Sequence, residues 1–178
     1  MTAKTICKIG NDLLIKVSQP VIQFDTPTLH KLIADMLTTM QATHGAGLAA
    51  PQIGINLQVM VFGVDNNPRY PTAEKVPQTV LINPDIKILS QEKTYLWEGC
   101  LSVPGLRGLV PRFKHIYYCG YDVKGNFIER EVSDFHARVV QHEYDHLNGI
   151  LMPQRVADMR QFGFESELKE KIAADYEK

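Results

Sequence analysis

The run from Asp134 to Asn148 constrains the fold most, because it reads as one amphipathic helix with a buried side. Apolar and histidine residues recur along one face at the spacing of three or four that a helix requires: Phe135, Val139, His142 and His146. Gly149 follows and can end the helix in a left-handed conformation. Such a face has to be covered by other elements, so the run predicts a central, packed helix.

Residues 142–146 of this helix read His-Glu-Tyr-Asp-His, an H-E-x-x-H pattern. The imidazoles of His142 and His146 lie one turn apart on the same side and can bind one metal ion. Glu143 is rotated by about 100° from His142 and can approach a metal-bound water without binding the ion. The alternative is a pair of histidines buried in the core, but a carboxylate directly after the first histidine favours a metal site.

A catalytic metal site needs a third protein ligand and an open position. The third histidine of the longer peptidase pattern would fall at residue 152, which is Met152. Glutamates further downstream are an alternative, although their charge-rich surroundings indicate a solvated face: Glu165, Glu167 and Glu170. Cys100 in Glu-Gly-Cys-Leu-Ser (98–102) is the remaining candidate, because a thiolate binds Zn²⁺ or Fe²⁺ well and Gly99 allows close backbone approach.

The segment Gly45–Gln52 is rich in small residues and would let a substrate lie against exposed backbone. The side-chain amide of Gln52 could stabilise an oxyanion. A phosphate-binding loop is the rival interpretation, but the G-x-x-x-x-G-K-[ST] pattern is missing.

The remaining elements predict an α+β fold, in which antiparallel β-sheets pack around the metal-binding helix. An N-terminal helix starts at Pro27 behind the capping residue Thr26 and should end near His44-Gly45, where glycine tolerates a left-handed conformation, and a C-terminal helix covers 165–177. Strands are expected over the apolar and β-branched segments, with a hairpin turn at 124–126: 57–64, 79–82, 86–89, 115–123 and 127–132. A strand before Cys100 is followed by a turn at Val103–Gly105, and residues 66–77 form a surface loop.

Composition limits the class of protein. The chain has 178 residues, a net charge of −1 and no basic run, so we expect one catalytic domain over residues 1–178, no nucleic-acid partner and no membrane surface. No run of about 18 apolar residues is present, and the N-terminus does not read as a secretory signal. Three cysteines make a poor disulfide framework and indicate a cytoplasmic protein.

The three motifs together resemble the peptide deformylase family. Its hallmarks G-x-G-L-A-A-x-Q, E-G-C-L-S and Q-H-E-x-D-H-L-x-G match Gly45–Gln52, Glu98–Ser102 and Gln141–Gly149, in that order and at every fixed position. The resemblance spans Ile9 to about Met152, which is most of the chain.

The resemblance implies one divalent metal ion per chain, Fe²⁺ in the cell and Zn²⁺, Ni²⁺ or Co²⁺ in other preparations. It implies that the ligands are Cys100, His142 and His146 and that Glu143 is the general base and then the acid. Gln52 and the backbone N–H of Leu101 would form the oxyanion hole.

The implied reaction is hydrolysis of the N-terminal formyl group of formyl-methionyl nascent polypeptides, which releases formate and a free amine. The expected substrate contacts come from backbone, pocket and nearby charged positions: Ala46, Gly47, Leu96, Gly99, Arg107, Phe135 and Val139. Some relatives dock on the ribosome through a basic C-terminal helix, so a transient ribosome contact is an expected partner, although the tail of this chain is near neutral. The alternatives are a zinc peptidase that uses a downstream glutamate and a structural metal module with a fourth protein ligand.

Overall fold

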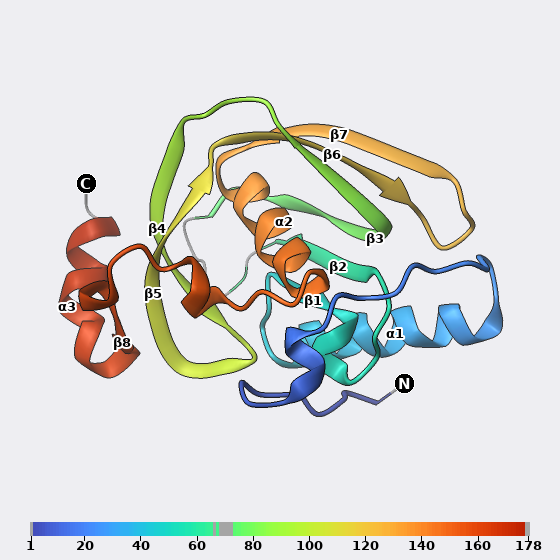
Figure 1. The fold of residues 1–178 in the computed structure, drawn as a ribbon, viewed down its shortest axis with the longest axis horizontal. Helices are drawn as coiled ribbons and strands as arrows, with labels where there is room; N and C mark the ends of the chain where they lie inside the picture. The colour runs from blue at the N-terminus through green and yellow to red at the C-terminus, as the bar shows by residue number, and fades with distance from the viewer. Residues whose placement is uncertain (1, 66, 68–72, 177–178) are drawn as a thin grey trace.

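The computed structural model describes residues 2–65, 67 and 73–176. The described part forms antiparallel sheets and helices, which confirms the α+β prediction (Figure 1). One sheet has the order β1 (Gly47–Ala49), β2 (Val59–Val64), β3 (Val76–Ile88), β6 (His115–Tyr121) and β7 (Phe127–Ser133). The other has the order β4 (Lys93–Cys100), β5 (Val103–Phe113) and β8 (Phe162–Phe164). The α-helices are α1 (Pro27–Ala42), α2 (Asp134–Leu147) and α3 (Glu165–Tyr176), and short 3-10 helices cover Asp12–Ile15, Ala50–Ile53, Met152–Arg155 and Met159–Gln161.

The central helix α2 lies between the two sheets and contacts β1, β2, β5 and β7 (Figure 1). Ala137, Val140 and Leu147 pack into a buried cluster with Phe62 and Tyr118. The predicted helix is therefore confirmed, and it is the element against which both sheets are packed.

The backbone just after the end of α2 requires a glycine at position 149. Gly149 has a φ of 69°, and a Cβ there would lie 2.6 Å from the backbone carbonyl of Ile15. A side chain is thus excluded both by the backbone conformation and by a close crossing of the chain.

The N-terminal helix α1 begins as predicted, since Thr26 Oγ1 accepts a hydrogen bond from Leu29 N at 3.2 Å. Its apolar stripe is buried against β1 and β2. The helix ends at Ala42, slightly before the predicted end near His44-Gly45, and the left-handed conformation expected of Gly45 is taken by His44, with a φ of 52°.

Several strand predictions need correction. The two strands expected at 79–82 and 86–89 are one strand, β3, with a register irregularity between Ile82 and Asp85. The turn expected at Val103–Gly105 is wrong, because the chain turns at 101–102 and β5 starts at Val103. Of the expected loop, residues 66 and 68–72 lie outside the described part, whereas residues 76 and 77 belong to β3.

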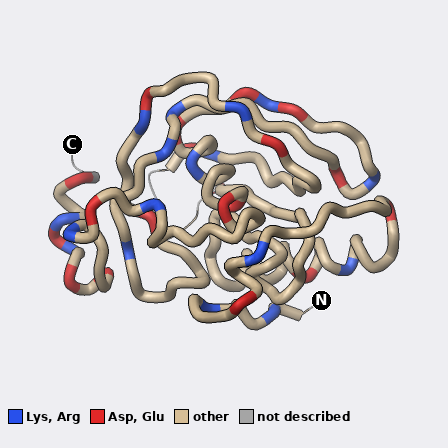
Figure 2. Tube along the Cα trace, viewed as in Figure 1, with Lys and Arg blue, Asp and Glu red and all other residues tan. Residues whose placement is uncertain are grey.

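The helix α3 packs against β5 and β8, on the opposite side of the small sheet from α2 (Figure 1). Acidic and basic residues are mixed along α3 and along β7 (Figure 2). None of the helices in the described part is both long and apolar enough to cross a membrane.

Candidate functional site

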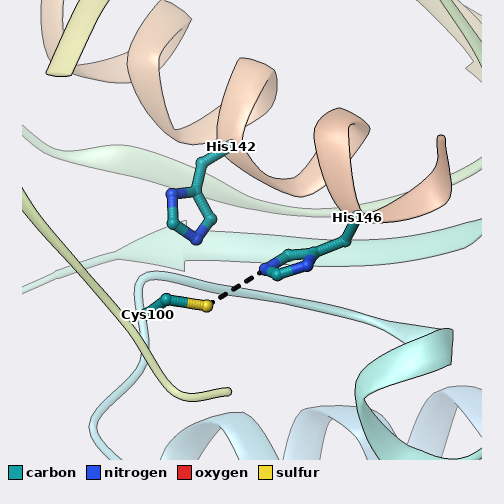
Figure 3. A group of neighbouring side chains, drawn as sticks. All are labelled: Cys100, His142 and His146. Atoms are coloured by element: carbon teal, nitrogen blue, oxygen red, sulfur yellow. Dashed lines mark hydrogen bonds between the residues drawn. The ribbon is translucent and has the colours of Figure 1, made fainter. Parts of the chain in front are cut away.

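The fold brings together three side chains from two distant parts of the chain. The Cys100 sulfur and ring nitrogens of His142 and His146 all lie within 4.8 Å of one another (Figure 3). Cys100 stands at the end of β4, and the two histidines project from successive turns of α2 toward it. Cys100 Sγ is 3.3 Å from His146 Nε2, and these two residues are 4% and 1% exposed.

This donor set fits a divalent metal ion. Burial alone would raise the pKa of Cys100, but the His146 and His142 rings lower it well below the ordinary value of a thiol. This shift favours the thiolate, the form that binds metal ions. His146 Nδ1 is buried and has no hydrogen-bond partner in the described part of the chain. One thiolate and two imidazoles suit Fe²⁺ or Zn²⁺, and three protein ligands leave a position for the reactants.

The downstream glutamates considered as third ligands lie elsewhere. Glu165 begins α3 and forms an ion pair with Arg107 Nη2 at 3.0 Å. Among the described residues, the ligand-type side chains that converge are Cys100, His142 and His146.

A buried carboxylate, Glu98, holds the first histidine in place. Glu98 Oε2 lies 2.9 Å from His142 Nδ1, and Arg112 contacts both carboxylate oxygens at 3.0 Å. Arg138 Nη1 donates to Glu98 Oε1 at 2.6 Å. Burial would raise the pKa of Glu98, but the charges and hydrogen bonds of Arg112 and His142 together more than offset this, so the pKa lies well below its ordinary value. A carboxylate on the second ring nitrogen fixes the tautomer and orientation of a ligating histidine.

Arg112 extends this network to Asp145, which lies between the two histidines of α2. Asp145 also accepts from Arg155 Nη2 at 2.6 Å. The sequence reasoning assigned no role to Glu98, Arg112 or Asp145. The available signal was that Glu98 and Asp145 occupy fixed positions in the motifs that contain the ligands.

Glu143 is buried beside the ligand group, with 4% of its surface exposed. Burial raises its pKa to about 6, although the neighbouring imidazoles act in the opposite direction. Gly47 of β1 packs directly on this carboxylate, because a Cβ at Gly47 would lie 2.6 Å from Glu143 Cδ. Glu143 Oε2 has no hydrogen-bond partner in the described part, so it is free to exchange a proton with a reactant.

The amide of Gln52 lies next to the sulfur. Gln52 Oε1 accepts from Ala49 N at 2.9 Å, which orients the NH₂ group. Gln52 Nε2 is 3.8 Å from Cys100 Sγ and donates to Ser102 Oγ at 3.1 Å. Ser102 is fully buried and was not singled out from the sequence. Its hydroxyl keeps the Gln52 donor directed at the site.

A cavity of about 580 Å³ opens beside these residues. Its walls include nearly all the substrate contacts expected from the sequence: Ala46, Gly47, Leu96, Gly99, Phe135 and Val139. Arg107 lies behind the wall, where its guanidinium packs against Gly99. The wall residues of β1 and β4 belong to strands at the edges of their sheets. The fold and site thus define a class: an α+β protein with a Cys/His/His group that could hold a metal ion, a buried glutamate beside it and a cavity between two sheet edges, an arrangement suited to metal-assisted hydrolysis.

Comparison with known proteins specifies the family. The sequence model of the polypeptide deformylase family matches residues 3–162. Peptide deformylase 2 of Ralstonia nicotianae is 56% identical over 173 residues, which cover 97% of this chain and 98% of that protein. The chain belongs to the polypeptide deformylase family.

Solved structures of peptide deformylases are also similar to this chain. The class I type b peptide deformylase of Acinetobacter baumannii with Met-Ala-Ser bound has a TM-score of 0.84 and 38% identity, covering 87% of this chain and 99% of that one. The peptide deformylase of Thermotoga maritima has a TM-score of 0.79 and 35% identity, covering 89% and 100%. The chain is a metal-dependent enzyme that hydrolyses the N-terminal formyl group of nascent polypeptides.

Proposed function

We propose that Cys100, His142 and His146 hold the catalytic metal ion and that Glu143 is the general base and acid of deformylation. The observation that carries this proposal is the convergence of the three ligand atoms within 4.8 Å, beside a buried carboxylate and an open cavity. A divalent ion held there supplies Lewis acidity, which polarises a carbonyl and lowers the pKa of a water from about 15.7 to about 7.

Glu143 then moves the protons of the reaction. Its carboxylate accepts a proton as water attacks the formyl carbon, and it returns a proton to the amine as the C–N bond breaks. The products are formate and a peptide with a free N-terminal amine. A pKa of about 6 suits a group that has to act in both directions near neutral pH.

Gln52 and the backbone N–H of Leu101 stabilise the developing oxyanion in this proposal. Gln52 is fixed through Ala49 and Ser102, so its donor does not have to reorganise as charge develops. Leu101 follows Cys100 directly and also lines the cavity. Loss of one such donor typically lowers turnover by about 10²–10³-fold.

The substrate backbone lies between the edges of β1 and β4, where unpaired N–H and C=O groups can add a strand. Gly47 and Gly99 allow the peptide to approach these edges closely. The methionine side chain occupies the apolar part of the cavity, between Phe135, Val139 and Leu96. We therefore expect faster turnover of formyl-Met peptides than of formyl-Asp peptides.

The proposal includes the setting of the reaction. We assign residues 1–178 to one catalytic domain that uses Fe²⁺ in the cell, with Zn²⁺, Ni²⁺ or Co²⁺ as replacements. The substrates are formyl-methionyl nascent chains in the cytoplasm, reached through transient contact with the ribosome. Three free thiols support a reducing compartment.

Metal analysis of anaerobically purified protein, combined with a formyl-Met-Ala-Ser assay, tests this proposal. We expect about one divalent ion per chain, activity that a chelator removes, and recovery on adding Fe²⁺. Cys100→Ser should lose both the metal and the activity. A Cys100→Ser protein that keeps both would instead favour a site with a downstream glutamate.

A further inference from the structure

The cavity wall formed by β4 extends well beyond the metal ligands. Leu96, Trp97, Glu98 and Gly99 line the cavity on the N-terminal side of Cys100. Residues in a strand advance by about 3.4 Å each, so Trp97 lies about 10 Å along β4 from Cys100. An extended peptide whose formyl group is at Cys100 would reach Trp97 with about its third residue.

Trp97 is held from behind by the C-terminal helix. It is 4% exposed, and its indole Nε1 donates to Asp175 Oδ2 at 3.0 Å. Asp175 lies in the last turn of α3, 78 residues from Trp97 in the sequence. The position of this tryptophan in the wall therefore depends on a helix that supplies no metal ligand.

The other end of α3 holds the neighbouring wall position. Arg107 pairs with Gly99 across the β4–β5 ladder, and a Cβ at Gly99 would lie 2.7 Å from Arg107 Cζ. Arg107 Nη2 donates to Glu165 Oε1, the first residue of α3, at 3.0 Å. Leu168, which is 6% exposed, anchors the helix between these two attachments.

The two attachments share one side of β4. Side chains alternate along a strand, so Trp97 and Gly99 face α3 and Glu98 faces α2. Glu98 accordingly contacts Arg138 and His142 of α2. The register of β4 is irregular between Gly99 and Cys100, and the Cys100 sulfur also lies on the α2 side, 3.3 Å from His146 Nε2. The helices α2 and α3 lie on opposite sides of β4 (Figure 1), so the contacts of β4 with the histidines of α2 and its attachments to α3 are on opposite sides of the strand.

We infer that α3 is a positioning element for the substrate chain: through Trp97–Asp175 and Arg107–Glu165 it sets the wall that binds the second and third residues after the formyl group. The formyl-methionyl end is bound by α2, β1 and the end of β4, and does not depend on α3. This inference rests on the proposed binding of the substrate along β4. It makes α3 a determinant of affinity for the peptide chain, distinct from the chemistry at the metal site.

Substrate length tests the inference. The double variant Asp175→Ala/Glu165→Ala removes both attachments and should raise KM for formyl-Met-Ala-Ser by roughly 2–10-fold, the effect of losing one or two ordinary hydrogen bonds. Its kcat for that tripeptide, and its kcat/KM for formyl-Met alone, should stay within about twofold of the unaltered enzyme. Glu170→Gln, at an exposed position of the same helix, is the matched control and should change neither substrate.

A conservative variant separates positioning from folding. Asp175→Asn keeps a side-chain oxygen that can accept the Trp97 indole N–H, so it should retain the KM of the unaltered enzyme where Asp175→Ala does not. Equal losses for formyl-Met and formyl-Met-Ala-Ser, or no change for either, would overturn the inference. Absence of activity of the unaltered enzyme on formyl-Met-Ala-Ser would instead contradict the proposed function itself.

Discussion

The helices α2 and α3 pack against the same strand, β5, from opposite sides, and each forms an ion pair with an arginine of that strand. On the α2 side, Arg112 and Asp145 are 4% and 5% exposed. On the α3 side, the Glu165 side chain that pairs with Arg107 is 55% exposed. The same kind of interaction is thus buried at one helix and solvated at the other. We therefore expect burial, not the number of charges, to make α2 the more rigidly held helix and α3 the more weakly held one.

The largest effect should come from the carboxylate that α2 presents to the cavity. Glu143→Ala should lower kcat for formyl-Met-Ala-Ser by about 10²–10⁴-fold, because proton transfer loses its only positioned group in the proposed site. The metal content should be unchanged, since Glu143 is not a ligand in the proposal. Steady-state kinetics together with metal analysis measure both quantities, and Glu170→Gln on α3 is the control. Unimpaired turnover in Glu143→Ala would contradict the assigned role.

The buried ion pairs should have the next largest effect, and it concerns stability. Arg112→Met leaves Glu98 and Asp145 buried without their shared cation, which typically costs about 3–5 kcal/mol of the free energy of unfolding. For a chain of this size, Tm should fall by about 2–4 °C for each kcal/mol. Calorimetry on the metal-loaded protein measures the shift.

Arg160→Met is the matched control for that substitution. Arg160 pairs with Asp158, but its side chain is 90% exposed. The free energy of unfolding should therefore change far less than in Arg112→Met. If the two variants lost equal stability, burial would not be what distinguishes the two sides of the small sheet.

The packing should also be tighter beside α2 than beside α3. Gly47→Ala places a Cβ against Glu143, whose buried side chain has little room to move. We expect kcat to fall by about tenfold or more, as for other small displacements of a catalytic group. Gly163 of β8 lies beside α3, where a Cβ would meet Leu168 at an ordinary 3.7 Å. Gly163→Ala should therefore retain activity, and an equal loss in the two alanine variants would contradict the difference in packing.

The helical parts of the fold were predictable because their signals are local. A cap at Thr26 and a stripe of period 3.6 identified α1, and the same periodicity identified α2. The strand β5 was not predictable from propensity, since it contains Pro104 and Pro111. The structure accommodates both prolines because β8 pairs with β5 at residues 106–108, and no other strand of the described residues pairs with that edge of β5 at either proline.

The candidate site was predictable where a residue type itself indicates chemistry. Cysteine, histidine and glutamate at motif spacing pointed to the group at Cys100, His142 and His146. The roles of Glu98, Arg112 and Asp145 were not predictable, because a charged residue is expected to be exposed to solvent until its partners are known. Only the packing of β4 and β5 against α2 shows that Arg112 lies between Glu98 and Asp145. Tertiary contacts between distant segments carry this information, and no local pattern does.

The smallest effect should be the stability change from an exposed attachment of α3. Glu165→Gln removes the charge of a pair whose carboxylate is largely solvated, so the free energy of unfolding should fall by about 0–1 kcal/mol. Denaturant unfolding at low and high salt measures this, and the difference from the unaltered enzyme should shrink at high salt because screening already weakens the pair. A loss as large as that of Arg112→Met, or one insensitive to salt, would mean that α3 is held as rigidly as α2. A small and salt-sensitive loss would show that α3 can shift without unfolding the enzyme, which is the property required of a helix that adjusts the substrate wall and leaves the metal site in place.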